Sequence, residues 1–230
     1  MVGLLFSHLN PQSKPKTLRV EPSGVQWLKP GLRKYSCKLT VDSNTVNGRI
    51  KLSDTNREWT HVEACQAYDD HLDRFNTPQM LCTDGLTGRC YWEVEWRGRA
   101  AISVSYRGIS RKDELNNEFG KNDQSWSLIC CDGDEVDYSV WHENKVKPIT
   151  RPSLSSLIRS IRSPSCTVTH RVAVYLDHDA GTLSFYRVSS DTLIHLHTVN
   201  TTFTKPLYPG FGFTSRHRFV PGSSVSLCSL

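Results

Sequence analysis

Residues 88–96 read GRCYWEVEW, and this stretch decides the fold class. From Trp92 to Trp96 every second residue is apolar, and the residues between them are acidic. Strict alternation of this kind is typical of a β-strand that turns one face to a core. We therefore expect both tryptophans to point inward as core residues. Side chains placed in this way do not form an exposed platform for stacking nucleic-acid bases.

The same period of two recurs on both sides of this stretch. Alternating apolar residues occupy 39–41, 50–52, 102–106, 126–130, 172–176, 183–185, 194–196 and 225–227. Turn-forming residues separate the runs at 84–85, 97–98, 132–133 and 179–181. Many short strands without a long helical pattern predict an all-β fold, namely a two-sheet antiparallel β-sandwich.

Length and composition agree with a single packed domain. The chain has 230 residues, of which 37% are hydrophobic, and this content is enough for a core. Lys and Arg outnumber Asp and Glu by 28 to 23, and the excess is spread along the chain. Nothing in this balance predicts a nucleic-acid partner. The sequence contains no apolar run of about 18 residues, so we expect no membrane span, and its start lacks the pattern of a secretory signal.

The cysteines predict a compartment. Eight are present, at positions 37, 65, 82, 90, 130, 131, 166 and 228. They form no Cys-x-x-Cys pair, and several fall inside strand-like runs. This pattern favours buried, reduced thiols and a cytoplasmic protein, with disulfides as the alternative. A glycosylation sequon at Asn200 would matter only if the chain were secreted.

Two stretches interrupt the strand pattern. Residues 1–35 are basic and broken by prolines, as expected of a lead-in or linker. Residues 148–170 contain no acid, and apolar residues from Leu154 to Ile161 have helical spacing after a candidate N-cap at Ser153. Residues 148–170 form either a basic amphipathic helix that binds a partner or a membrane surface, or a long insertion between strands. A helix this short is only marginally stable on its own, and we therefore favour the insertion.

Motifs for catalysis are missing. Neither Gly-x-Ser-x-Gly nor His-Glu-x-x-His occurs, and Leu115 stands where a P-loop ending at Gly120 would need glycine. His195 and His197 would share one face of a strand, as two metal ligands can. That face is expected to be the solvent side, and no third ligand lies nearby in sequence. We expect no enzyme, no cofactor, no metal and no small-molecule substrate.

Four ordered stretches resemble the motifs of one family. They are 39–53, 88–96, 171–186 and 206–213, which resemble the leucine-aspartate motif, the Trp-Glu-Val-Glu signature, the third motif and the terminal strand of the PRY-SPRY (B30.2) domain. The resemblance covers about residues 36–228. It implies a concanavalin-like jelly-roll sandwich with a PRY segment at 36–90 and a SPRY segment at 91–228, after a lead-in at 1–35.

The sequences of residues 84–89 and 25–35 are similar to those of C-terminal PRY-SPRY domains in fish NOD-like receptors and stonefish-type cytolysins. Residues 76–78 depart from the family, which often has tryptophan before the proline. The resemblance implies a non-catalytic module that recognises a protein partner, within an innate immune receptor or a ubiquitin-ligase-type assembly. The alternative is the C-terminal domain of a secreted pore-forming cytolysin.

The resemblance also implies a binding canyon lined by variable loops. Carried over to this chain, the candidate partner-binding residues are Arg107, Ile129, Cys131, Phe211 and Phe213, with Tyr68, Phe75 and Trp141 as further candidates for either binding or packing. Exposed aromatic and arginine side chains at a loop-rich surface are the usual hot spots of protein interfaces. We expect the protein ligand to contact these side chains.

Overall fold

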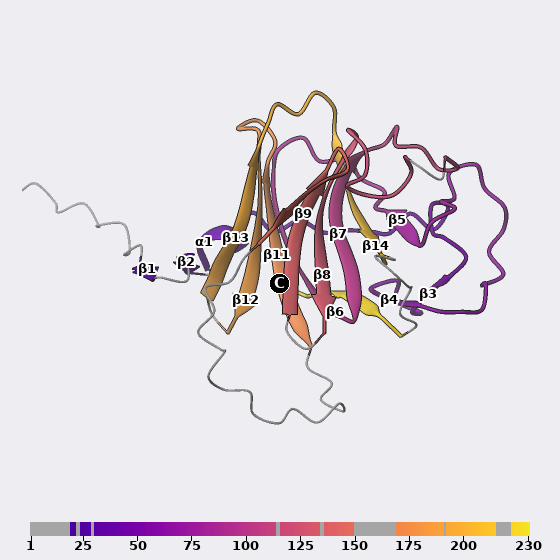
Figure 1. Ribbon diagram of the computed structural model, residues 1–230, viewed down its shortest axis with the longest axis horizontal. Coiled ribbons are helices and arrows are strands. Elements are labelled where there is room, and N and C mark those ends of the chain that lie inside the picture. The colour runs from indigo at the N-terminus through magenta and orange to yellow at the C-terminus, as the bar shows by residue number, and fades with distance from the viewer. Residues whose placement is uncertain are drawn as a thin grey trace, which may run out of the picture.

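The computed structural model describes residues 19–21, 24–28, 30–113, 116–133, 136–149, 169–190, 192–214 and 222–230. Within these ranges the chain forms fifteen β-strands and one short helix, and the strands make two antiparallel sheets packed face to face (Figure 1). The two-sheet antiparallel sandwich expected from the alternating runs is confirmed. The candidate helix at 154–161 and residues 1–18 of the lead-in lie outside the described residues.

The larger sheet contains the strand that decided the fold class. Its nine strands, in spatial order, are β1 (Arg19–Glu21), β2 (Gly24–Leu28), β13 (Thr192–Asn200), β12 (Thr182–Ser189), β11 (His170–Asp177), β6 (Arg89–Arg97), β15 (Ser224–Leu227), β4 (Glu58–His61) and β3 (Ile50–Leu52). The signature strand β6 is central in this sheet, with β11 on one side and β15 on the other.

The smaller sheet lies on the other side of the core. Its six strands, in spatial order, are β10 (Lys145–Pro148), β9 (Val136–His142), β8 (Ser125–Asp132), β7 (Arg99–Tyr106), β14 (Leu207–Gly212) and β5 (Gln79–Leu81). The described residues contain no helix that is long and apolar enough to cross a membrane.

The core lies between the two sheets. Trp92, Val94 and Trp96 are buried in it, as the alternation predicts. Trp59 and Phe185 reach the same core from other strands of the larger sheet. Burial of several large aromatic side chains supplies most of the hydrophobic stabilisation in a sandwich of this size.

The second face of β6 is covered as well, which the alternation does not predict. Tyr91 and Glu93 are both fully buried. Leu32 of the short helix α1 (Pro30–Arg33) packs against the cluster that contains Tyr91, and Arg33 of the same helix lies 3.7 Å from the Glu93 carboxylate. The Glu93 carboxylate accepts a 2.8 Å hydrogen bond from the Tyr91 hydroxyl and lies 3.4 Å from Arg171. A buried charge needs partners of this kind. The end of the lead-in is therefore part of the domain and does not act only as a linker.

The cysteines are not all free thiols. Cys37 and Cys90 form a disulfide, with their Cα atoms 5.5 Å apart, so the expectation of reduced cysteines is wrong for this pair. Among the described residues, Cys65, Cys82 and Cys130 carry free thiols. Cys82 and Cys130 are buried as expected, and burial raises the pKa of both thiols. Raised pKa values make these two thiols poor nucleophiles.

Candidate functional site

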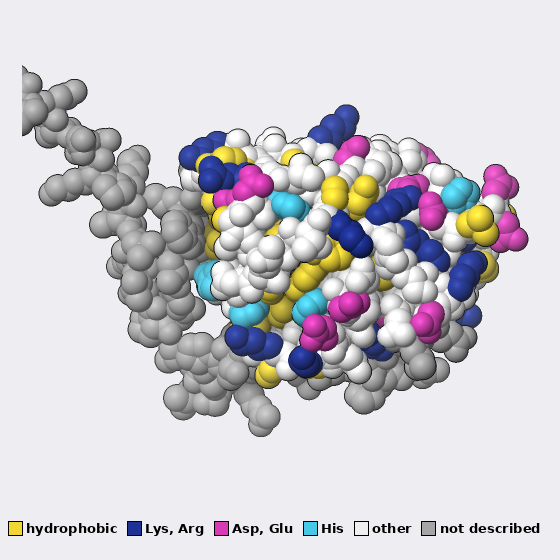
Figure 2. Space-filling model, turned by 90° about the horizontal axis from the view of Figure 1, so that it is seen from above, with side chains coloured by type: hydrophobic (Ala, Val, Ile, Leu, Met, Phe, Trp, Pro, Cys, Tyr) yellow, Lys and Arg dark blue, Asp and Glu magenta, His cyan; other side chains and the backbone are white. Residues whose placement is uncertain are grey.

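Loops gather at one end of the sandwich, at the top of Figure 1. We call this surface the loop rim and define it by residues 68–75, 107–113, 116–124, 143–144, 178–181 and 201–206. Figure 2 looks down on it and shows charged side chains around a band of hydrophobic ones with histidines at its edges. Loops on a rigid sandwich are the usual place for binding residues, because they vary without disturbing the core.

Aromatic rings in contact with one another close the top of the core under the rim. The ring of Trp126 packs against Tyr106 and Phe203, with centroids 5.5 and 5.2 Å away. His142 stacks on Trp126 with centroids 4.6 Å apart, and His178 lies 5.6 Å from Phe203. The rim is therefore built on an aromatic floor.

Arg107 lies at the rim, directly after β7, as the sequence predicts. Its side chain is 35% exposed, and its guanidinium contacts the carboxylates of Asp42 at 2.8 Å and Asp73 at 2.9 Å. The guanidinium also lies 5.7 Å from the ring of Tyr208. Both acids lie within residues 36–90, the expected PRY segment, so Arg107 fastens that part of the chain to the end of β7. The expected role in partner binding stays a prediction.

Arg111 and Phe75 form a second tie between the segments. The Arg111 guanidinium lies 4.4 Å from the ring of Phe75 and donates 3.0 Å hydrogen bonds to the carbonyl oxygens of Arg107 and Asp73. Phe75 is buried, and its ring meets that of Phe119 edge to face at 5.8 Å. Of the two roles left open for Phe75, the structure shows packing.

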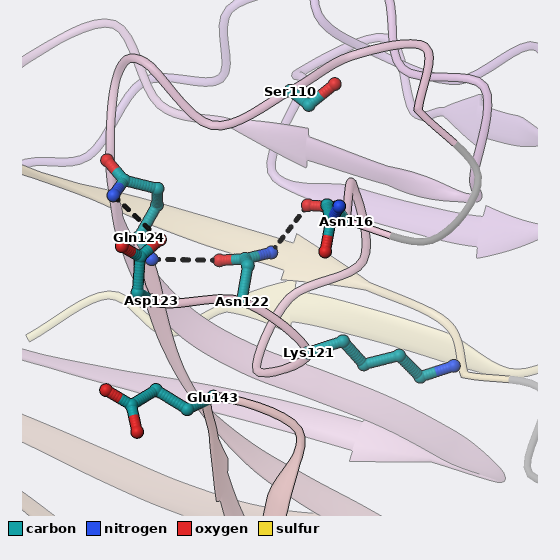
Figure 3. Close-up of a pocket in the computed structure, with 7 residues that line it drawn as sticks. All are labelled: Ser110, Asn116, Lys121, Asn122, Asp123, Gln124 and Glu143. Carbon is teal, nitrogen blue, oxygen red and sulfur yellow. Dashed lines mark hydrogen bonds between the residues drawn. The ribbon is translucent and has the colours of Figure 1, made fainter.

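A polar pocket of about 520 Å³ opens in the rim (Figure 3). It is lined by Ser110, Asn116, Lys121, Asn122, Asp123, Gln124 and Glu143. The buried Asn122 amide shapes the loop: its nitrogen donates to the carbonyl oxygens of Asn116 at 2.8 Å and Glu118 at 2.9 Å. Its oxygen accepts from the backbone of Gln124 at 3.1 Å. Exposed amides and charges of both signs suit peptide groups and polar side chains of a protein.

Sequence reasoning missed this pocket. The signal available was the run from Asn116 to Gln124, which is rich in amides and contains Gly120 at a φ of 83°. Glycine adopts such a backbone conformation without strain, whereas other residues rarely do. A polar run with a glycine of this kind is also common in loops that bind nothing, so the sequence alone does not identify the pocket.

The candidates on the outer face of the smaller sheet are only partly accessible. Ile129 is buried, so its expected exposure is wrong; in the centre of the sheet it stands between Ala101 and Ser139 of the neighbouring strands. Cys131 and Trp141 are partly exposed, and the Trp141 indole donates a 2.9 Å hydrogen bond to Ser139. No contact in the described part of the chain assigns either of them a binding role.

The phase of β14 corrects two further candidates. Phe211 is fully buried with its ring 4.7 Å from Trp59, and Phe213 is buried 5.6 Å from the ring of His61. Both point into the sandwich because they share the inward face with Leu207. The expectation that one of the two phenylalanines is exposed is wrong.

Two tyrosines near the rim are partly exposed. Tyr208, on the outward face of β14, lies beside Arg107. Tyr68 donates a 2.8 Å hydrogen bond to the carbonyl of Ile50, and Arg74 lies 5.3 Å from its ring. Tyr68 is therefore anchored in the PRY segment, and its partner-binding role stays a prediction.

The histidine pair on β13 does not share a face. A register shift at Leu196 places His195 opposite Tyr186 and His197 opposite Phe185. Cross-strand partners share a face, and Tyr186 belongs to the outer cluster whereas Phe185 belongs to the core. Among the described residues, no group of three or more His, Cys, Asp or Glu side chains is arranged to hold a metal ion.

Comparisons with known proteins agree with the motifs. The SPRY domain family matches residues 89–222. Stonustoxin subunit beta of Synanceia horrida is 37% identical over 182 residues, which are 78% of this chain and 24% of the toxin subunit. Tripartite motif-containing protein 14 of Mus musculus is 32% identical over 186 residues, which are 76% of this chain and 37% of that protein.

Solved structures of related proteins superpose on this chain as well. A stonustoxin structure superposes with a TM-score of 0.73 at 32% identity, covering 91% of this chain and 32% of the toxin chain. The TRIM65 PSpry domain superposes with a TM-score of 0.69 at 23% identity, covering 94% of this chain and all of that domain, and it supports the fold alone. The chain spans about a quarter of the length of the stonefish toxin subunits it matches. With more than half of its length matched, this chain belongs to the SPRY domain family.

Proposed function

We propose that the chain is a non-catalytic recognition module that binds a protein partner through the loop rim. One observation carries this proposal: the rim is preorganised by side chains that tie one loop to another. Arg107, Arg111 and Asn122 make these ties, which leave the pocket open to solvent. Loops that are already ordered lose little conformational entropy on binding, so more of the contact energy appears as affinity.

The proposed setting is the C-terminal part of an innate immune receptor or of a ubiquitin-ligase-type assembly in the cytoplasm. The similarity to tripartite motif-containing protein 14 supports this setting, because SPRY domains serve protein interaction in tripartite-motif proteins. In such an assembly, the domain would select the target and other domains would act on it.

A second candidate is the C-terminal domain of a secreted pore-forming cytolysin. Two observations favour it: the similarity to stonustoxin over most of the chain, and the Cys37–Cys90 disulfide. Structural disulfides persist in oxidising compartments and are rare in the cytosol.

Alkylation of thiols during lysis of the source cells separates the cytoplasmic candidate from the secreted one. Only a secreted protein keeps Cys37 and Cys90 oxidised in its native form.

Charge reversal in the pocket tests rim binding. A partner would be found by affinity capture with the full chain and then titrated, purified, in a calorimeter. We expect Asp123→Lys, which inverts an exposed charge in the pocket lining, to weaken binding at least tenfold. Glu58→Lys is the matched control, since it reverses an exposed charge on β4 of the larger sheet. If both variants bind like the unmodified chain, the pocket is not part of the binding surface.

A further inference from the structure

Leu72 is far more exposed than any other large hydrophobic side chain in the described part of the chain. It is 89% exposed, whereas the next two, Leu230 and Val146, are 45% and 39% exposed. Leu72 lies in the loop between β4 and β5, within the sequence Asp-Asp-His-Leu-Asp at 69–73. At one end of the face in Figure 2, acidic and histidine side chains surround a hydrophobic one.

The loop that presents Leu72 has a fixed backbone. The guanidinium of Arg74 donates hydrogen bonds to the carbonyl oxygens of Asp69 at 3.1 Å, Ser43 at 3.2 Å and Val46. The same guanidinium lies against the ring of Tyr68. Arg74 thus fixes the base of the loop to the PRY segment.

The tip of the loop is fixed as well. The backbone N–H of Asp73 donates a 3.0 Å hydrogen bond to Nδ1 of His71, and the N–H of Arg74 donates to the carbonyl of His71 at 3.1 Å. The Asp73 carboxylate pairs with Arg107 of the rim. Leu72 is therefore held out into solvent by the structure around it. A single exposed leucine on a surface is ordinary; one on a loop tied down on both sides resembles a preorganised anchor.

Acidic side chains surround this anchor. Asp69 and Asp70 are exposed, and within the described residues neither makes an ion pair. Their charges disfavour a phospholipid surface or a nucleic acid as the occupant, because both are anionic. They favour a surface that carries lysine or arginine, since complementary charges raise the association rate and fix the orientation of docking.

We propose that Leu72 inserts into an apolar pocket of a protein partner and that Asp69 and Asp70 pair with lysine or arginine side chains around that pocket. The proposal rests on partner binding at the loop rim and adds the chemistry of the partner's surface. Tyr68 and Arg74 position the anchor.

Photo-crosslinking in the source cells is the first test. A photoreactive leucine analogue is placed at position 72 of the full chain, or at position 146, the exposed valine on the edge strand β10, as the control. We expect position 72 to yield a discrete adduct that position 146 does not. Equal yields from the two positions would overturn the proposal. An adduct alone does not support it, so the crosslinked protein must also bind the purified chain.

Calorimetry with that purified partner is the second test. We expect Leu72→Ala to weaken binding about thirtyfold, as for a hot spot, and Leu72→Met to stay within about threefold, because its volume is similar. The Asp69→Asn, Asp70→Asn double variant should lower the association rate and reduce its dependence on salt. All of these side chains are exposed, so unchanged thermal unfolding serves as the check on folding.

The outcomes separate this inference from the proposed function. If Asp123→Lys weakens binding and Leu72→Ala does not, the rim binds the partner and the anchor proposal is wrong. If neither variant weakens binding, the proposed function of the rim fails as well. If Leu72→Ala weakens binding and the aspartate variant leaves the salt dependence unchanged, the basic character of the partner's pocket is wrong.

Discussion

At the residue scale, Arg107 shows how one side chain can serve both folding and binding. An arginine at the end of a strand is expected to be available to a partner, yet its guanidinium already contacts two carboxylates. Ion pairs at such partly exposed positions contribute little each, because water screens them. Their main effect here is geometric, since Asp42 and Asp73 come from different parts of the PRY segment.

Removing the Arg107 guanidinium tests this role. We expect Arg107→Ala to lower the free energy of unfolding by about 1 kcal/mol, because the pairs are partly solvated. A double-mutant cycle with Asp73→Ala, measured by urea unfolding, should give a coupling energy of the same sign. A variant that unfolds like the unmodified chain but binds the partner weakly would instead make Arg107 a direct contact.

Phe211 and Tyr208 on β14 offer a contrasted pair. Phe211 is fully buried against Trp59, so Phe211→Ala should cost about 3–5 kcal/mol of unfolding free energy by opening a cavity. Tyr208 faces outward at the rim, so Tyr208→Ala should change stability little. Urea unfolding of the two variants decides the phase of the strand. Equal losses would mean that β14 is packed on both faces at these positions.

At the element scale, the alternation of apolar and polar residues predicts the strands well. It predicts poorly whether other parts of the chain bury the outward-facing side chains of those strands. The inward set of β6 follows from its period of two, and the structure confirms it. The burial of Glu93 on the other face depends on α1, which is distant in sequence, and a local pattern carries no information about it. The local pattern also fails to predict the bulge on β13. One extra residue at Leu196 places His195 and His197 on opposite faces of the strand.

The candidate site was harder to predict than the fold for a related reason. Alternation on β14 gives two possible phases, and glycines at 210 and 212 leave the choice open because they have no side chains to mark a face. The family resemblance suggested Phe211 and not Tyr208 as a surface residue, and the local pattern could not correct it. Leu72 was missed because a single leucine in a polar loop gives no periodic signal.

The Cys37–Cys90 disulfide also belongs to the element scale, because it joins the start of the PRY segment to β6. The two cysteines are 53 residues apart, and closing a loop of that length in the unfolded chain corresponds to about 4 kcal/mol in the chain-entropy view. We expect Cys37→Ser to lower the urea midpoint in oxidising buffer. In reducing buffer the variant and the unmodified chain should differ little.

Thiol titration provides the control for that experiment. In the denatured, unreduced protein, two thiols fewer should react than after reduction, and peptide mapping should assign them to Cys37 and Cys90. If all eight cysteines of the chain react without reduction, the pair is a dithiol in the isolated protein. The stability difference would then have to come from packing.

At the scale of the whole molecule, the sandwich presents the loop rim at one end of two packed sheets. Both faces of β6 are largely buried, so this central strand of the larger sheet tolerates little change. The smaller sheet ends in β10, a short edge strand with two lysines and a proline, and such features oppose pairing with strands of other chains. The loop rim is then the surface on which a specific contact can form without disturbing the core.

The response of the whole domain to pH follows from three histidines. Burial lowers the pKa of His61, His195 and His197, and the charge of Arg49 further lowers that of His61. The unfolded chain binds protons at these positions near pH 6.5, whereas the folded chain does so only at lower pH. Unfolding therefore takes up protons in that window, and stability falls as the pH falls below about 6.5.

Urea unfolding at pH 7.5, 6.5 and 5.5 measures this response. We expect similar stability at the first two values and a clear loss at the third, with at most about 1.4 kcal/mol per pH unit from each histidine that stays neutral. Aspartate and glutamate titrate near pH 4 in the unfolded chain and contribute little to this window. His61, which is 3% exposed beside Phe213, should contribute most, so His61→Gln should flatten the curve. Equal stability at pH 7.5 and 5.5 in the unmodified chain would show that the three imidazoles titrate alike in the folded and unfolded states.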